Sequence, residues 1–162
     1  MPASTIGLNL KGGFPGTVSA LPDDIVRTFQ VKADTSVKVG QPVELHNVSG
    51  ANPQIKPAAE HTLGIVLRGV RTPTGLSYTQ FGAEIPAGEF VDVLLRGNCS
   101  VKIDSGTPVA GAVVNFDTAT GNFTAAAVVD EGTVVASENI VFASAVKDTD
   151  GMVEVTVKTR AI

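Results

Sequence analysis

The stretch Gly151-Met152-Val153-Glu154-Val155-Thr156-Val157-Lys158 near the C-terminus decides the fold class. Valine recurs there at every second position, and the residues between the valines are polar. Side chains of a β-strand alternate between two faces, so this pattern predicts a strand that is buried on one face. Val91–Arg96 shows a similar alternation, which Leu94 breaks. The dominant period of the chain is therefore two, which favours an all-β protein.

Further strands are expected where an alternating or short apolar segment lies between turn residues. These segments are Thr28–Lys32, Val37–Val39, Pro42–His46, Gly64–Leu67, Val101–Ile103, Ala112–Phe116, Gly132–Ala136 and Ile140–Val146. Turn residues such as Pro86-Ala87-Gly88 separate them at close spacing. The pattern predicts a jelly-roll-like β-sandwich or barrel of about nine or ten short strands. One short helix is also expected around Ser19–Arg27, where Pro22, Asp23 and Asp24 suit a first turn.

Two segments of the chain resemble each other. Val37-Lys38-Val39-Gly40-Gln41-Pro42-Val43 is similar to Val101-Lys102-Ile103-Asp104-Ser105-Gly106-Thr107-Pro108-Val109. Each joins an alternating segment to a Gly-x-Pro-Val turn that opens the next strand. The similarity marks either two related halves of a barrel or the common chemistry of a turn between strands. We favour the turn interpretation.

The first 18 residues differ in composition from the rest. They contain two prolines, four glycines and one charged residue, Lys11, together with scattered apolar residues at Ile6, Leu8, Leu10 and Phe14. A terminal segment is usually loosely ordered unless it docks onto something, and apolar content favours docking. We therefore expect an extended N-terminal arm over residues 1–18, which contacts the domain or a neighbour, and a single β-sandwich or barrel domain over residues 19–162.

Charge and aromatic content limit the classes of partner. Charged residues make up 17% of the chain, against about 25% in an average soluble protein. Either part of the surface is covered by a partner, or a large core lies beneath a Ser- and Thr-rich surface. The net charge is −4 and no basic run occurs, so direct nucleic-acid binding is not expected. Tyr78 is the one tyrosine and there is no tryptophan, which argues against stacking on bases or sugars.

Targeting signals are not recognised in the sequence. No window approaches 18 consecutive apolar residues, so no membrane-spanning segment is expected. The N-terminus lacks the basic start and apolar stretch of a signal peptide, and synthesis in a cytoplasm is the expectation. Cys99 is the only cysteine, so an internal disulfide cannot form.

Candidate catalytic and metal-binding groups are few. Cys99, His46 and His61 are the only cysteine and histidine residues, and their spacing matches no zinc site. A lone cysteine in a strand is most often a small core residue. Asp148-Thr149-Asp150-Gly151 begins like a calcium loop but lacks the remaining ligands, so a hairpin turn is the better interpretation. We expect no enzyme activity, no cofactor and no metal site.

The order of these motifs resembles the structural cement, or capsid decoration, proteins of tailed bacteriophages. The resemblance covers roughly residues 20–160. It is carried by the segments His61–Val70, Ile85–Gly97, Gly106–Gly121 and Gly151–Val157. They contain a Gly-Ile-Val strand, an alternating strand that ends in Arg-Gly, a Pro-Val turn, an Asp-x-x-Thr-Gly hairpin and a closing strand. The resemblance implies a jelly-roll-like fold and a position on the exterior of the virion capsid.

The function implied by the resemblance is structural. A cement protein, made in the host cytoplasm, would bind the phage major capsid protein and bridge neighbouring capsid subunits, as a dimer or trimer of its own. The arm residues Ile6, Leu8, Leu10 and Phe14 would then contact the capsid or a sister subunit. The alternative is a carbohydrate- or receptor-binding β-sandwich module of a phage particle, which would use exposed aromatic side chains such as Tyr78.

Overall fold

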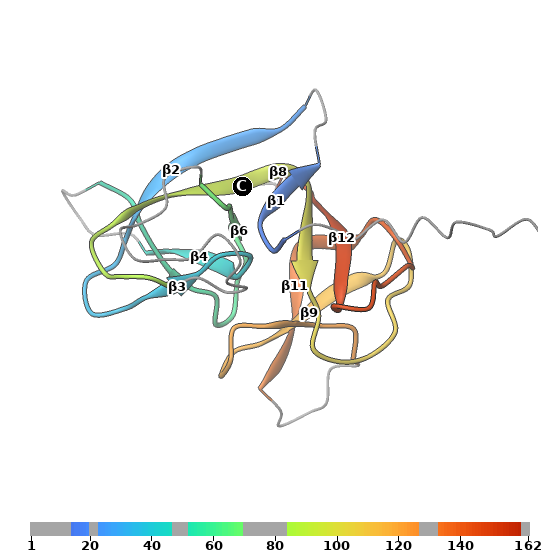
Figure 1. Cartoon of the computed structure of the whole chain (residues 1–162). Coiled ribbons are helices and arrows are strands. Elements are labelled where there is room, and N and C mark those ends of the chain that lie inside the picture. The colour runs from blue at the N-terminus through green and yellow to red at the C-terminus, as the bar shows by residue number, and fades with distance from the viewer. Residues whose placement is uncertain (1–13, 20–22, 47–51, 70–83, 127–132, 160–162) are drawn as a thin grey trace, which may run out of the picture.

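The computed structural model describes residues 14–19, 23–46, 52–69, 84–126 and 133–159. These residues form twelve β-strands and no helix (Figure 1), which confirms the all-β sandwich or barrel architecture. The strands are β1 (Thr17–Ser19), β2 (Ile25–Val31), β3 (Val37–Lys38), β4 (Pro42–His46), β5 (Gln54–Pro57), β6 (Gly64–Val66), β7 (Glu84–Ile85), β8 (Phe90–Lys102), β9 (Val113–Asp117), β10 (Phe123–Thr124), β11 (Val134–Phe142) and β12 (Met152–Val157). In the described ranges no helix is long and apolar enough to cross a membrane.

Nine of the strands form two closed rings that share one long strand, β8. In the first barrel, the N-terminal half of β8 pairs with β2, and β2 is followed by β5, β4 and β6, which pairs again with β8. In the second barrel, the C-terminal half of β8 pairs with β12, and β12 is followed by β11, β9 and β10. A bridge between Ile103, just after β8, and Phe123 in β10 closes this ring. The chain is thus built from two barrels with β8 in common (Figure 1).

The two barrels have the same strand order. In chain order the strands of the first barrel are β2, β4, β5, β6 and β8, and those of the second are β8, β9, β10, β11 and β12. In both barrels the first strand pairs with the fifth, the fifth with the fourth, the fourth with the second and the second with the third. The third strand closes each ring on the first through the one parallel pairing, Val31 opposite Ile55 in the first barrel and Ile103 opposite Phe123 in the second. Lys32, which follows Val31, donates its N–H to the Ile55 carbonyl at 2.8 Å. In the same way Asp104, which follows Ile103, donates its N–H to the Phe123 carbonyl at 3.0 Å.

The sequence similarity noted above falls at matching places in this topology. The segment from Val37 leads into β4, and the segment from Val101 leads into β9, which are the second strands of their barrels. Gly40 and Gly106 both have a φ of +81°, a value that L side chains rarely adopt. The topology therefore favours two related halves over the turn interpretation, and each half is a complete barrel.

Two strands form a wall between two hydrophobic cores. In β6, Val66 belongs to the core of the first barrel, while Ile65 packs into the core of the second. In β8, Val93 and Leu94 divide between the cores in the same way. Because both faces of this wall are buried at β6, that strand is a continuous apolar run, as the Gly64–Leu67 segment predicted.

Polar side chains join the barrels beside this wall. Thr62, just before β6, is fully buried and donates its hydroxyl to Asn139 Oδ1 of β11 at 2.5 Å. The Asn139 amide donates to the carbonyl of Leu63 at 3.2 Å. Next to them His61 Nδ1 lies 2.9 Å from Glu138 Oε1 on the surface. These contacts tie the segment before β6, in the first barrel, to β11 in the second.

Glu44 of β4 holds the start of this connecting segment. Its Oε2 accepts the backbone N–H groups of Ala59 and Glu60 at 2.8 and 3.2 Å, and its Oε1 lies 2.7 Å from Lys56 Nζ. Burial alone would raise the pKa of Glu44, but the Lys56 ammonium and these amides outweigh burial and hold that pKa below its ordinary value. Glu44 is therefore a charged anchor for the loop that carries the inter-barrel contacts.

The structure corrects several expectations about individual elements. The helix expected around Ser19–Arg27 is wrong, because Ser19 ends β1 and Ile25–Arg27 begins β2. There β-branched residues pair with β8 in an antiparallel ladder, and this pairing outweighs the local first-turn signal. Val91–Arg96 and Val101–Lys102 belong to one strand, β8, where two were expected. Val134–Ala136 and Ile140–Phe142 likewise belong to one strand, β11, and the strand expected to run on to Val146 ends at Phe142. The short strands β1, β5, β7 and β10 were not expected.

Candidate interaction surfaces

The cysteine and histidine residues do not assemble a nucleophilic site. Cys99 is fully buried in the core of the second barrel. Burial raises the pKa of its thiol far above the ordinary value, and the carboxylates of Glu154 and Asp24 raise it further. His46 ends β4 of the first barrel, and His61 faces Glu138 on the surface. Among the described residues, no three His, Cys, Asp or Glu side chains lie close enough to hold a metal ion.

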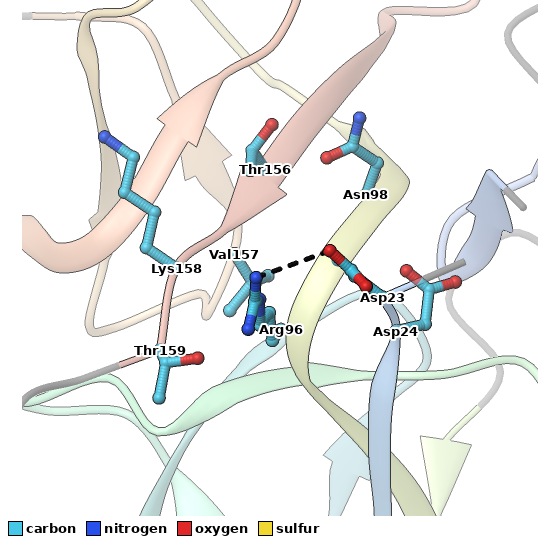
Figure 2. A pocket seen from close by; sticks show the side chains of 9 residues that line it. Asp23, Asp24, Arg96, Asn98, Thr156, Val157, Lys158 and Thr159 are labelled. Atoms are coloured by element: carbon cyan, nitrogen blue, oxygen red, sulfur yellow. Dashed lines mark ion pairs between the residues drawn. The ribbon is translucent and has the colours of Figure 1, made fainter. Parts of the chain in front are cut away.

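A shallow depression of about 480 Å³ lies where the first barrel meets the second (Figure 2). Its lining residues come from the start of β2, the middle of β8 and the end of β12: Asp23, Asp24, Arg96, Gly97, Asn98, Thr156, Val157, Lys158 and Thr159. Arg96 Nη2 lies 3.5 Å from Asp23 Oδ2 across it. Both of these side chains are largely exposed, so the pair contributes little to stability.

The side chain of Asp24 in this depression packs against the backbone of β8 at Gly97. Gly97 has a φ of +129°, and a Cβ atom built on it would lie 2.0 Å from Asp24 Oδ1. The carboxylate thus occupies the space that a side chain at position 97 would need. Asp24 Oδ1 is buried and has no hydrogen-bond partner among the described residues. We interpret the depression as the joint at which β8 passes between the barrels.

The described end of the N-terminal arm is attached to both barrels. Thr17–Ser19 forms β1, which pairs with Asn98–Ser100 of β8. Gly16 donates its N–H to the Ser100 carbonyl at 2.8 Å and accepts the N–H of Arg68 at 3.0 Å. The Arg68 guanidinium lies over the Phe14 ring, 4.5 Å from its centroid, a cation–π contact. Residues 14–19 are therefore attached to both barrels, and we call them the base of the N-terminal arm.

Of the four candidate contact residues of the arm, Phe14 is the one that lies in the described part of the chain. Phe14 is 39% exposed, so part of its ring remains open beside Arg68. Ile6, Leu8 and Leu10 lie outside the described residues, as does Tyr78. Their roles in contacts, and the division of the chain into an arm and a domain, stay predictions.

An uncharged group of exposed residues lies on the second barrel. It consists of Val109–Val113 together with Ala143, Ala145 and Val146, and we call it the valine patch. All eight residues are exposed. The Gly111 N–H donates to the Phe142 carbonyl at 2.8 Å, and the Phe142 N–H donates to the Ala112 carbonyl at 2.9 Å, so the two segments lie side by side. Val109, Val113 and Val146 are 61, 49 and 76% exposed.

The sequence carried a signal for the valine patch that our interpretation did not use. Val109-Ala110-Gly111-Ala112-Val113 has no charged or polar side chain, and Ala112–Phe116 was assigned to a strand only. The strand is confirmed from Val113 onward. An exposed apolar patch rimmed by polar residues is typical of a protein-binding surface. The fold was needed to place the end of β11, at Phe142, beside this run.

Comparison with known proteins identifies the family. No curated protein matches the chain. The model of one family, described as "Structural cement protein (E217 gp24/Pam3 gp6)", matches residues 1–158. This match spans both barrels and also residues 1–13, and it agrees with the resemblance seen in the strand and turn motifs. The chain therefore belongs to the structural cement protein family of phages.

Proposed function

We propose that this chain binds the outer surface of a phage capsid and stabilises the shell by bridging neighbouring major capsid subunits. The observation that carries the proposal is the valine patch, which presents eight exposed residues without a charge. An interface of this kind excludes water without leaving an unpaired ion buried. A bridging protein works by holding surfaces together, so the proposed role is not enzymatic.

Bridging requires two separate contact surfaces on one copy. The valine patch is one of them. The N-terminal arm is the second, because its base is fixed to both barrels through Gly16 and β1, and a fixed base transmits load from the arm to the domain. We propose Ile6, Leu8, Leu10 and Phe14 as its contacts. Each contact can be weak, because many copies on one lattice act together.

Co-sedimentation with expanded, decoration-free phage heads tests the proposal. Wild-type protein should bind expanded heads saturably and at a fixed copy number, and unexpanded heads serve as the control for shell state. The triple variant V109S/V113S/V146S should bind at least about tenfold more weakly, since burying one valine side chain contributes roughly 1.5 kcal/mol or more.

A matched variant tests whether the loss of any exposed apolar side chain, and not only of the valine patch, weakens head binding. Phe90→Ser removes a side chain that is 66% exposed but lies on the first barrel, and it should leave head binding unchanged. Equal weakening by both variants would contradict the assignment of the valine patch. If the wild-type protein does not bind expanded heads, capsid binding itself is refuted, and a glycan screen would then test the carbohydrate-binding alternative.

A further inference from the structure

One face of the first barrel carries an exposed aromatic side chain among polar ones. In β8, Val91 and Val93 belong to the core of this barrel. Side chains of a strand alternate between two faces, so Phe90 and Asp92 lie on the outer face of the sheet. Residues of β2 and β5 that lie beside them in the sheet complete this face. We call it the Phe90 face, and its members are Phe90, Asp92, Thr28, Gln30 and Gln54.

The exposure of Phe90 is not a requirement of the fold. Gln30 and Lys102 occupy equivalent places, one residue before the parallel pair that closes each barrel. Phe90 lies opposite the first and Met152 opposite the second. Met152 is 1% exposed, whereas Phe90 is 66% exposed. The low content of tryptophan and tyrosine argued against stacking on sugars, but an exposed phenylalanine ring offers the same kind of face.

Hydrogen bonds hold the polar side chains of the Phe90 face in place. Thr28 Oγ1 donates to Asp92 Oδ1 at 2.6 Å. Gln30 Nε2 donates to the Gly88 carbonyl at 3.1 Å, and Gln54 Nε2 donates to Gln30 Oε1 at 3.3 Å. A carboxylate accepts more than one hydrogen bond and an amide NH2 group donates two, so these groups can still bind hydroxyl groups. Because they are already ordered, a ligand that binds them immobilises few side chains.

We propose that the Phe90 face binds a neutral carbohydrate. The face of an aromatic ring is negative, and the C–H groups of a sugar ring can stack on it. Sugar hydroxyls both donate and accept hydrogen bonds, which suits a ring flanked by amides and a carboxylate. A protein surface that covered Phe90 would leave these polar groups unpaired unless it matched each of them. Asp92 is the one charged member of the face, and its carboxylate disfavours acidic sugars by charge repulsion.

A glycan array tests the inference. The protein is coupled in many copies to fluorescent beads, so that weak contacts add up, and applied to neutral glucans, galactans and mannans and to glycans that contain uronic or sialic acid. At least one neutral glycan should bind the wild-type beads. Phe90→Ala should lower that signal at least about tenfold, because the stacking surface is lost.

Leu45→Ala is the matched control. Leu45 is an apolar side chain of the same barrel and is 40% exposed. It lies opposite Ile55, a core residue, and therefore on the other face of the sheet from the Phe90 face. Leu45→Ala should bind the glycan as the wild type does. An unchanged melting temperature of Phe90→Ala shows that its loss of binding is not a loss of folding.

Three results would overturn the inference. The first is that no neutral glycan binds the wild-type beads. The second is that Phe90→Ala binds as the wild type does, or that it and Leu45→Ala lose binding equally. The third is a signal that falls more than about threefold between about 0.05 and 0.5 M NaCl, since salt screens charges and a neutral ligand has none.

This inference goes beyond the proposed function, because it gives the first barrel a ligand of its own. The variant V109S/V113S/V146S should keep its glycan binding, since the valine patch lies on the second barrel. A chain that binds heads and no neutral glycan would refute the carbohydrate site alone. A chain that binds the glycan through Phe90 and fails to bind heads would refute the capsid role alone.

Discussion

Replacing Thr62 by valine should destabilise the protein by removing one buried contact between the barrels. Thr62 is fully buried and Asn139 is 5% exposed, so Asn139 Oδ1 would lose its 2.5 Å donor with no water to replace it. Leaving a buried acceptor without a partner costs about 1–3 kcal/mol. A chain of this size loses roughly 2–4 °C of melting temperature per kcal/mol, so the variant should melt about 2–12 °C below the wild type.

Thermal and urea unfolding of T62V measure this change, and T28V is the matched control. The Thr28 hydroxyl donates to Asp92 Oδ1 at 2.6 Å on an exposed sheet face, where water can replace it, so its loss should stay within about 0.5 kcal/mol. In a double-mutant cycle the costs of T62V and N139A should not add, because either change breaks the same bond. Equal effects of T62V and T28V, or strict additivity in the cycle, would refute the reasoning.

Three further predictions concern other parts of the fold. Gly97→Ala should lower the free energy of unfolding by about 2 kcal/mol or more, since φ is +129° and the new Cβ meets Asp24; adding Asp24→Ala should recover part of that loss. The carboxylate of Glu44 has a lowered folded-state pKa, so its stabilisation is present at neutral pH and lost as the pH falls through that value. Urea midpoints of wild type and E44Q should therefore differ at pH 7 and converge below pH 4.5, the ordinary value; a constant gap would contradict the anchor role. The Cys99 thiol should react with Ellman's reagent only after denaturation, and rapid reaction of native protein would contradict its burial.

Alternating segments of the sequence predicted most strands because each of them is buried on one or both faces. Pro42–His46 and the Met152–Val157 region were recovered almost residue by residue. The missed strands are short, and β10 has only two residues, too few to show a period. The continuity of β8 was also missed, because the alternation over Val91–Arg96 breaks at Leu94 and a glycine, Gly97, follows it. Only the space occupied by Asp24 shows why a glycine belongs inside this strand.

Sites on this protein were harder to predict than strands. A nucleophile or a metal ligand has a characteristic residue type, but a binding surface depends on which apolar residues the fold leaves uncovered. Val113 and Val114 are identical in the sequence, yet the first is half exposed and the second is fully buried. The family match identifies a structural cement protein, whereas the surfaces proposed for its contacts depend on which residues the fold leaves exposed.

The strand common to both barrels has a consequence for synthesis on the ribosome. The first barrel uses only strands before β8 and the part of β8 before residue 97, so that barrel has its complete set of strands while β9 to β12 are still unmade. The later half of β8 then waits for β12, the last strand, which takes a few seconds more at roughly 5–20 residues per second. Nascent chains therefore pass through a stage with one finished barrel and one exposed strand. A product truncated before β12 would be held at that stage, partly folded and prone to aggregate through the unpaired half of β8.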